Sequence, residues 1–343
     1  MTGMKKSLPA AALVMVMLLS LLAGCGQAPA SASANAASAA KSAVQAQAYI
    51  DGSAVQDADI SEEAVALDVM PAIFDLTPVA SGRLVGRSGK ASIDYSNTTD
   101  GYVMAKFSAA SQKKIKAQVK GPSGTVYTYN LTAGASDWTT FPLSDGNGSY
   151  TVSVYENTSG TKYYTVVSVS FSVTLKDEFA PFLRPNQYVN YAANAANTIA
   201  KAAELTKGLT DPLDKVKAVY QFVVTTLTYD RAKAASVQSG YLPVLDTVLA
   251  AKTGICFDYA ALMTAMLRSQ GVPCKLVVGY VGNAYHAWIS VWSAKTGWVN
   301  AAIYFDGNTW QRMDPTFASS AKQSAAIMQY IGDGSHYTAK YLY

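Results

Sequence analysis

The sequence predicts an α+β fold in which an all-β region precedes a group of helices and a small antiparallel sheet. Three observations support this prediction. Over residues 92–175, short runs of alternating apolar residues are separated by Gly, Pro, Asn and Asp. Over residues 190–267, apolar residues recur at helical spacing, and beyond Lys275 the period returns to two. Period two is typical of half-buried strands and a period near 3.6 of amphipathic helices.

The amino terminus resembles a bacterial lipoprotein signal. Two lysines precede an apolar run over residues 8–22, which is shorter than the roughly 20 residues that a membrane-spanning helix needs. The run ends in Leu-Ala-Gly-Cys at Cys25, which is similar to a lipobox. This resemblance implies a signal peptide over residues 1–24 and a lipid anchor at Cys25. The mature chain would then be held at the extracellular face of the bacterial cytoplasmic membrane.

The next segments are interpreted as a tether and a β-sandwich-like accessory domain. Residues 25–48 are a low-complexity Ala/Ser run without aromatic residues, so they cannot bury enough surface to form a core. Residues 49–178 are assigned to the accessory domain, although residues 49–90 could instead begin with a short helix. The strands are expected at "KKIKAQV", "TVYTYNL", "SYTVSVYE" and "YTVVSVSFSVTL". The tyrosines of these strands are either ordinary strand residues or a carbohydrate-binding face.

Residues 179–343 are expected to form a second domain of helices followed by strands. Asp211 can cap a helix whose first residue is Pro212. A later helix is predicted from Cys256 to Leu267, because Thr253 and Gly254 are turn types and the apolar residues that follow have helical spacing. Gly271 and Pro273, which are typical of the residues just beyond a helix, then end it.

Cys256 therefore lies in the first turn of a helix, where a thiol has chemical uses. Backbone N–H groups and the helix dipole stabilise a thiolate at this position, and the same N–H groups can bind an oxyanion. The alternative is a small buried core cysteine, since free cysteine is often buried. Cys274 is interpreted as an unpaired bystander, although an exported protein could in principle pair it with Cys256. Asp258 is interpreted as a first-turn acid that favours the helix.

A nucleophilic thiol needs a base, and the base needs an acceptor that fixes its tautomer. His286 begins a predicted strand in "GNAYHAWISVW", whereas His336 is expected at the surface. Asp314 lies where Pro315 ends a strand in "WQRMDPTF". Asp306 and Asn300 are rival orienting residues, but Asp306 in Asp-Gly is also a typical turn residue.

Four motifs together resemble the transglutaminase-like superfamily, whose members share a papain-like Cys-His-Asp arrangement. They are "GICFDYA", "GVPCKLVVGY", "YHAW" and "W-x-x-M-D-P-T", in that order, and the longer matches look like transglutaminase-domain lipoproteins of Gram-positive bacteria. The resemblance implies that Cys256 is the nucleophile, His286 the general base and acid, and Asp314 the residue that orients the imidazole. It also implies a side-chain oxyanion donor, for which Tyr229 is the candidate and Gln238 the alternative. Phe257 stands where animal transglutaminases carry Trp, and Lys275 stands where many relatives have Arg.

Other chemistries fit the sequence less well. The Cys and His residues show no CxxC or HxxH spacing, so no metal site is expected, and no P-loop or GxGxxG motif indicates a cofactor. The formal net charge is +4, and two of the positive charges lie in the segment expected to be removed. This near balance gives no reason to expect a nucleic-acid partner.

The sequence thus predicts a surface-anchored cysteine acyl-transfer enzyme that forms a thioester at Cys256. Its expected partners are protein or peptide amides, including cell-wall peptides, and the membrane through the lipid anchor. An amine acceptor would make it a transamidase, and water would make it an amidase or peptidase. The alternative from another class is a non-catalytic binding or adhesion lipoprotein.

Overall fold

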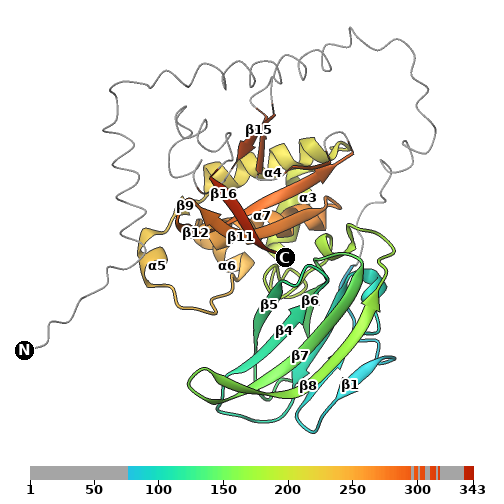
Figure 1. The fold of residues 1–343 in the computed structure, drawn as a ribbon. Helices are drawn as coiled ribbons and strands as arrows, with labels where there is room; N and C mark the ends of the chain where they lie inside the picture. Colours follow the sequence, from blue (N-terminus) through green and yellow to red (C-terminus); the bar gives the residue numbers. More distant parts are fainter. Residues whose placement is uncertain (1–75, 295–296, 300–301, 306–309, 314–315, 317–335) are drawn as a thin grey trace, which may run out of the picture. The chain divides into compact units, whose positions relative to one another are not determined.

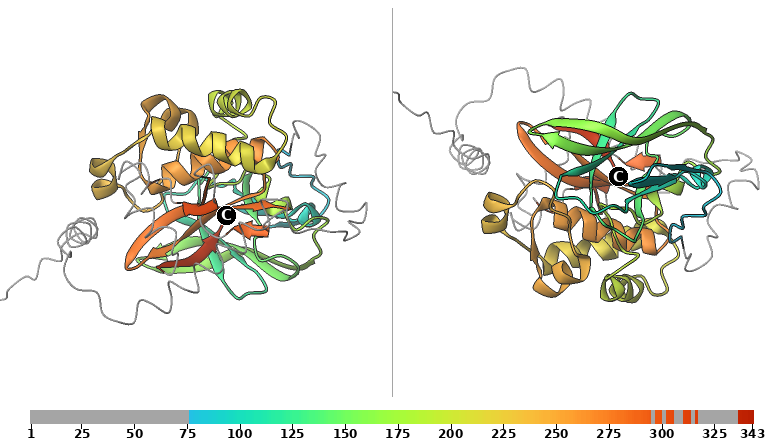
Figure 2. Two further views of the ribbon diagram at one scale, coloured as in Figure 1. Left: turned by 90° about the horizontal axis from the view of Figure 1, so that it is seen from above. Right: turned by 90° about the horizontal axis from the view of Figure 1, so that it is seen from below.

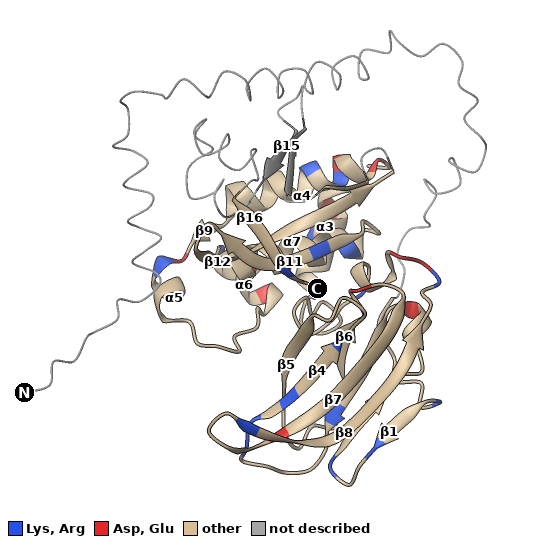
Figure 3. Ribbon diagram, viewed as in Figure 1, with Lys and Arg blue, Asp and Glu red and all other residues tan. Residues whose placement is uncertain are grey.

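The structure is a computed structural model that describes residues 76–294, 297–299, 302–305, 310–313, 316 and 336–343. The predicted signal peptide, the predicted lipid anchor at Cys25 and the predicted tether lie outside these residues. No helix in the described part of the chain is long and apolar enough to cross a lipid bilayer. Basic and acidic residues are both distributed over the described helices and strands (Figure 3).

One antiparallel sheet is built from four short strands in the order β1-β2-β3-β6. The strands are β1 Val85–Arg87, β2 Ala91–Asp94, β3 Tyr102–Phe107 and β6 Thr139–Pro142, and a 3-10 turn, η2, spans Thr98–Asp100 between β2 and β3. Strand β3 is buried at five of its six positions, so it is the centre of this sheet.

A second antiparallel sheet has the order β5-β4-β7-β8 (Figure 1). Its strands are β4 Ile115–Lys120, β5 Val126–Leu131, β7 Gly148–Ser159 and β8 Lys162–Val173. Alternate residues of β4 are buried, namely Ile115, Ala117 and Val119, as period-two patterning requires when one face is solvated. The neighbouring lysines and glutamine of β4 lie on the other face.

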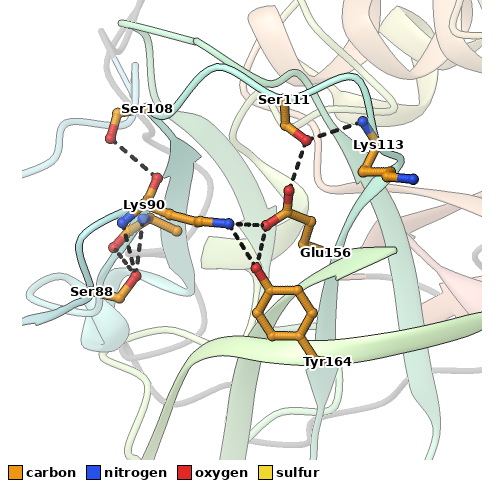
Figure 4. Close-up of polar contacts among 8 residues, drawn as sticks. Ser88, Lys90, Ser108, Ser111, Lys113, Glu156 and Tyr164 are labelled. Atoms are coloured by element: carbon orange, nitrogen blue, oxygen red, sulfur yellow. Dashed lines mark hydrogen bonds and ion pairs between the residues drawn. The ribbon is translucent and has the colours of Figure 1, made fainter. Parts of the chain in front are cut away.

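The two sheets contact one another through apolar and polar side chains. The ring of Tyr95, which follows β2, stacks on Phe171 of β8 with centroids 5.3 Å apart. At another point Lys90 Nζ lies 2.7 Å from the carboxylate of Glu156, which also accepts hydrogen bonds from Ser111 and Tyr164 (Figure 4). These contacts join the segments on either side of β2 to β7 and β8.

Over residues 196–269 the chain forms five α-helices, which follow a short 3-10 turn, η3 Ala180–Phe182. They are α3 Ala196–Leu205, α4 Pro212–Thr226, α5 Arg231–Ser236, α6 Leu245–Ala251 and α7 Cys256–Ser269. Helix α4 begins as the sequence predicts, with Pro212 at its first position and the Asp211 carboxylate accepting the N–H of Leu213 at 2.8 Å. The short helices α5 and α6 were not predicted.

Helix α7 is the centre of this part of the chain. Its residues from Asp258 to Arg268 are all buried, so the helix is covered on every side by other elements. Helices α3, α4 and α6 pack against it, and strands β11 and β12 cover another side (Figures 1 and 2). Gly271 follows the helix with φ 76°, a left-handed conformation that glycine adopts without strain.

A third four-stranded antiparallel sheet has the order β13-β12-β11-β16. Its strands are β11 Cys274–Val281, β12 Ala284–Ser293, β13 Gly297–Val299 and β16 Tyr337–Leu342. Two further strands, β14 Ala302–Phe305 and β15 Trp310–Met313, pair with each other. Cys274 Sγ lies 3.6 Å from Thr264 Oγ1, which places the face of β11 that bears Cys274 against α7.

Candidate active site

The predicted nucleophile, Cys256, is the first residue of α7. Its side chain is partly exposed and forms no disulfide. The preceding residue, Ile255, is extended, with φ −96° and ψ 176°, so the chain enters the helix abruptly at the cysteine. The N–H of a first helical residue has no acceptor within its helix. Cys256 therefore combines an accessible thiol with a backbone donor at the positive end of a helix.

The predicted oxyanion donor, Tyr229, lies beside the segment that leads into α7. A two-stranded parallel ladder pairs β9 (Thr228–Tyr229) with β10 (Thr253–Gly254), and its register sets Tyr229 opposite Gly254. The backbone N–H of Thr228 donates to Lys252 O, and the N–H of Asp230 donates to Gly254 O, each at 2.9 Å. Tyr229 therefore lies on the strand beside β10, opposite Gly254, which precedes Cys256 by two residues.

Asp258 has more partners than a first-turn acid requires. It is fully buried and lies 2.7 Å from Lys233 Nζ. It also accepts hydrogen bonds from the hydroxyl of Tyr241 and, at 2.8 Å, from the N–H of Ile255. The spacing from Ile255 is the usual signal of an N-terminal acid, whereas nothing in the sequence pattern pointed to Lys233 and Tyr241.

The predicted base, His286, lies near the beginning of β12 and is 8% exposed. Its register partner on β11 is Gly279, and its ring lies 6.2 Å from that of Trp288 at an interplanar angle of 19°. Because alternate residues share a face, His286 shares a face with Trp288, whereas Tyr285, Ala287 and Ile289 share the face that meets α7. The base is therefore held on a buried strand.

Tyr285, the residue before His286, relates the beginning of β12 to Cys256. The residue is 61% exposed, but its hydroxyl lies among other ionisable groups. Partial burial of the hydroxyl raises the pKa of Tyr285 to about 12, with smaller contributions from Tyr188, Tyr341, Tyr280 and Cys256. Helix α7 and strand β12 pack against one another. The Tyr285 hydroxyl lies within electrostatic range of Cys256, and His286 is the next residue along the strand.

Aromatic rings surround Phe257, the second residue of α7. Tyr188 lies 5.4 Å from it and Tyr241 lies 6.3 Å from it, measured between ring centroids. Tyr188 in turn stacks on Tyr343 at 4.0 Å with nearly parallel rings. The second position of α7 is therefore occupied by an aromatic ring that packs within a tyrosine cluster.

The other predicted residues lie farther away or outside the described part of the chain. Cys274 is fully buried and free, and burial raises the pKa of its thiol to about 11. Gln238 is exposed and donates to the backbone oxygen of Ser236 at 2.8 Å. Lys275 packs between the rings of Phe182 and Trp298, and burial lowers its pKa to about 8.

Three predicted or rival orienting residues, Asp314, Asp306 and Asn300, lie outside the described residues, so the structure does not place an acceptor for His286. His336 is exposed, as expected. In the described residues no group of three or more His, Cys, Asp or Glu side chains is arranged to hold a metal ion.

Residues 199–315 match the model of the Transglutaminase-like superfamily. These residues form a transglutaminase-like domain. The match spans Cys256, His286 and Asp314, and it confirms the family that the four motifs indicated. The domain has a transglutaminase-like, papain-like fold of mixed helix and sheet content. Members of this superfamily are typically cysteine enzymes.

Two curated proteins are similar to this domain. The uncharacterized protein YebA of Bacillus subtilis is 26% identical over 117 residues, which are 29% of this chain and 16% of that protein. The protein-glutamine gamma-glutamyltransferase of Pseudomonas aeruginosa is 26% identical over 156 residues, which are 41% of this chain and 21% of that protein. The chain therefore spans less than a quarter of the length of either relative.

Solved structures align with the chain at low similarity. A candidate cysteine protease from Cytophaga hutchinsonii aligns with a TM-score of 0.32 and 14% identity, over 71% of this chain and 81% of that one. Red sea bream transglutaminase aligns with a TM-score of 0.27 and 14% identity, over 65% of this chain and 49% of that one.

Proposed function

We propose that the transglutaminase-like domain transfers acyl groups from protein or peptide amides through a thioester at Cys256. The observation that carries this proposal is the position of Cys256, a partly exposed free thiol in the first turn of α7, a helix that packs against β12. Cys274, the other cysteine in the described part of the chain, is buried.

In the proposed reaction, His286 accepts the thiol proton and the Cys256 thiolate attacks the carbonyl carbon of a carboxamide. The S–C bond forms, and the oxygen becomes an oxyanion that the Cys256 N–H and the Tyr229 hydroxyl stabilise. The C–N bond then breaks, and the nitrogen leaves with the proton from the His286 imidazolium. An amine or water attacks the thioester, the C–S bond breaks, and the thiol is restored. Asp314 is proposed to orient the imidazole.

The remaining proposals concern location and organisation. We infer from the amino-terminal sequence that Cys25 is lipidated and that the domain works at the extracellular face of the membrane. Cell-wall peptides and surface proteins would then be the amides within reach. The sheets over residues 85–173 would form an accessory module beside the catalytic domain, and the domain boundary would lie near residue 179.

The test is to incubate the full chain with a glutamine-containing peptide, with and without a primary amine such as cadaverine. Ammonia release and the peptide's mass are measured for the wild type, Cys256→Ala, His286→Gln and Cys274→Ser. We expect product with the wild type and with Cys274→Ser, and no product with Cys256→Ala or His286→Gln. An amine adduct identifies transamidation, and glutamate alone identifies hydrolysis. Turnover by Cys256→Ala, or none by the wild type with any glutamine peptide or wall fragment, would contradict the proposal.

A further inference from the structure

Asp258 is the most completely enclosed ionisable group next to Cys256. Its side chain has no exposed surface, and three donors surround its two oxygens. The Nζ of Lys233 and the N–H of Ile255 donate to Oδ2 at 2.7 and 2.8 Å, and the hydroxyl of Tyr241 donates to Oδ1. A buried carboxylate is tolerated only when it is paired and hydrogen-bonded in this way. The three donors are therefore held firmly in place.

Two of these donors belong to a different part of the chain from α7. Lys233 lies in α5, whose first turn is fixed by the Asp230 carboxylate accepting the N–H of Lys233 at 2.8 Å. Tyr241 lies in the loop after α5, and Lys233 Nζ donates to its hydroxyl at 2.6 Å. The Asp258 carboxylate thus fastens residues 230–241 to the beginning of α7. Tyr229 is the residue immediately before this fastened segment.

The third donor is the backbone immediately before the nucleophile. By accepting the Ile255 N–H, Asp258 fixes the turn that aims the Cys256 N–H out of the helix. Asp258 therefore touches both segments that carry the proposed oxyanion donors.

Gly254 shows how closely these segments pack. A Cβ at Gly254 would lie 2.6 Å from Asp258 Cβ and 3.0 Å from its Oδ2. Gly254 is also the ladder partner of Tyr229. A side chain at position 254 would collide with the Asp258 side chain, which lies over β10. Gly254 leaves room for Asp258 and also pairs with Tyr229 of β9.

The charges of the network favour the same arrangement at neutral pH. Burial lowers the pKa of Lys233, but the hydrogen bonds that its ammonium group donates to Asp258 and Tyr241 outweigh burial and raise the pKa overall. Burial, and then the hydrogen bond to Asp258, raise the pKa of Tyr241 to about 12. Both groups are therefore protonated and able to donate to Asp258.

We propose that Asp258 is a positioning residue for acyl transfer, which acts through Lys233 and Tyr241 to hold Tyr229 and the Cys256 N–H in the arrangement that receives the oxyanion. This inference rests on the proposed function of Cys256. It assigns to Asp258 a role beyond helix stabilisation and adds Lys233 and Tyr241 to the site. It also predicts that the network affects acylation of Cys256, which passes through an oxyanion, and leaves unchanged its alkylation, which does not.

Two reagents separate these effects. Iodoacetamide alkylates Cys256 by displacing iodide from carbon, and no oxyanion forms. With p-nitrophenyl acetate, the thiolate attacks the carbonyl carbon, the C–O bond breaks and p-nitrophenolate departs. An acetyl thioester remains on Cys256, and water then hydrolyses it. This reaction passes through an oxyanion, and misplaced donors slow it. Both rate constants are measured on the full chain with the wild type, Asp258→Asn, Lys233→Met and Tyr241→Phe.

The matched control is Asp246→Asn. Asp246 also lies in the first turn of a helix, α6, and accepts hydrogen bonds from Asn197 and Thr198, away from Cys256. We expect the three network variants to alkylate at the wild-type rate and to acylate about ten- to a hundredfold more slowly, because small misplacements of catalytic groups have effects of this size. The control should change neither rate.

The outcomes are distinguishable. Equal losses in both reactions, or unchanged acylation, would overturn the positioning role of Asp258. If Asp258→Asn does not fold, Tyr241→Phe, which removes one oxygen from a partly exposed side chain, decides the question. If the wild type is alkylated at Cys256 but is not acylated, the proposed function itself fails and this inference falls with it.

Discussion

At the scale of single residues, the two described cysteines differ because of where the fold places them. Cys256 lies at the mouth of α7, with its side chain partly exposed. Cys274 begins β11, on the face packed against α7, with its thiol 3.6 Å from Thr264 Oγ1. Burial disfavours a charged thiolate, which explains the raised pKa of Cys274. The Cys256 side chain is therefore accessible from solvent, whereas the Cys274 side chain contributes to packing.

This difference predicts selective labelling. Under native conditions at pH 8, iodoacetamide should modify Cys256 and leave Cys274 unmodified, because the Cys274 thiol is buried and titrates near pH 11. Peptide mass mapping measures the modification, and the denatured protein, in which both thiols react, is the control. Native labelling of Cys274 at a rate equal to that of Cys256 would contradict the structure.

At the scale of elements, the position of His286 depends on a glycine of the neighbouring strand β11, Gly279. The pairing of β11 with β16 shifts between Val278 and Gly279, and His286 lies opposite Gly279. A Cβ at Gly279 would lie 2.1 Å from Thr338 O and 2.9 Å from the ring of Trp288. Backbone cannot move aside as a flexible side chain can, so these three strands can pack this closely only around a glycine.

Gly279→Ala should therefore destabilise the protein by about 1–3 kcal/mol, the usual cost of overpacking a buried site. Urea unfolding measures the change. Gly89→Ala is the matched control, because Gly89 is exposed and a Cβ there meets nothing within 4 Å, so its effect should stay within about 0.5 kcal/mol. Equal stability of the two variants would refute the close approach of β16 to β11.

At the scale of the whole molecule, the contact between the two amino-terminal sheets is sensitive to pH. Hydrogen bonds from Lys90, Tyr164 and Ser111 lower the pKa of Glu156 from its ordinary value of 4.5 to about 2. A carboxyl group with a lowered folded-state pKa stabilises the fold fully above its unfolded-state pKa. The stabilisation is lost as the pH falls from about 4.5 towards 2. Lys90 is about half exposed, so water and salt weaken this contribution.

The advantage of the wild type over Glu156→Gln in unfolding free energy should accordingly be larger at pH 7 than at pH 3. Urea unfolding at both pH values measures it, and Glu204→Gln, which removes an exposed carboxylate, controls for the loss of one negative charge. A difference between wild type and variant that does not depend on pH would show that the hydrogen bonds to Glu156 do not favour its ionised form.

Much of the site could be predicted from sequence because its residues stand at periodic or capped positions. The turn residues before Cys256 and the apolar spacing after it predicted the start of α7, and the Gly-Asn turn predicted the strand that bears His286. The ladder of β9 and β10 is two residues long, which is too short to show a period. Lys233 and Tyr241 meet Asp258 only through tertiary packing, which leaves no local pattern.

The strand order β13-β12-β11-β16 has a consequence for how the protein is made. Val277 of β11 pairs with Leu342 of β16. Strand β16, which completes the sheet that contains His286, is therefore synthesised long after β11. Contacts between residues so distant in sequence form late and slowly. While the chain is emerging, the sheet behind the candidate site is therefore incomplete. In a nascent chain, Cys256 would therefore be present before the last strand of the sheet that bears His286.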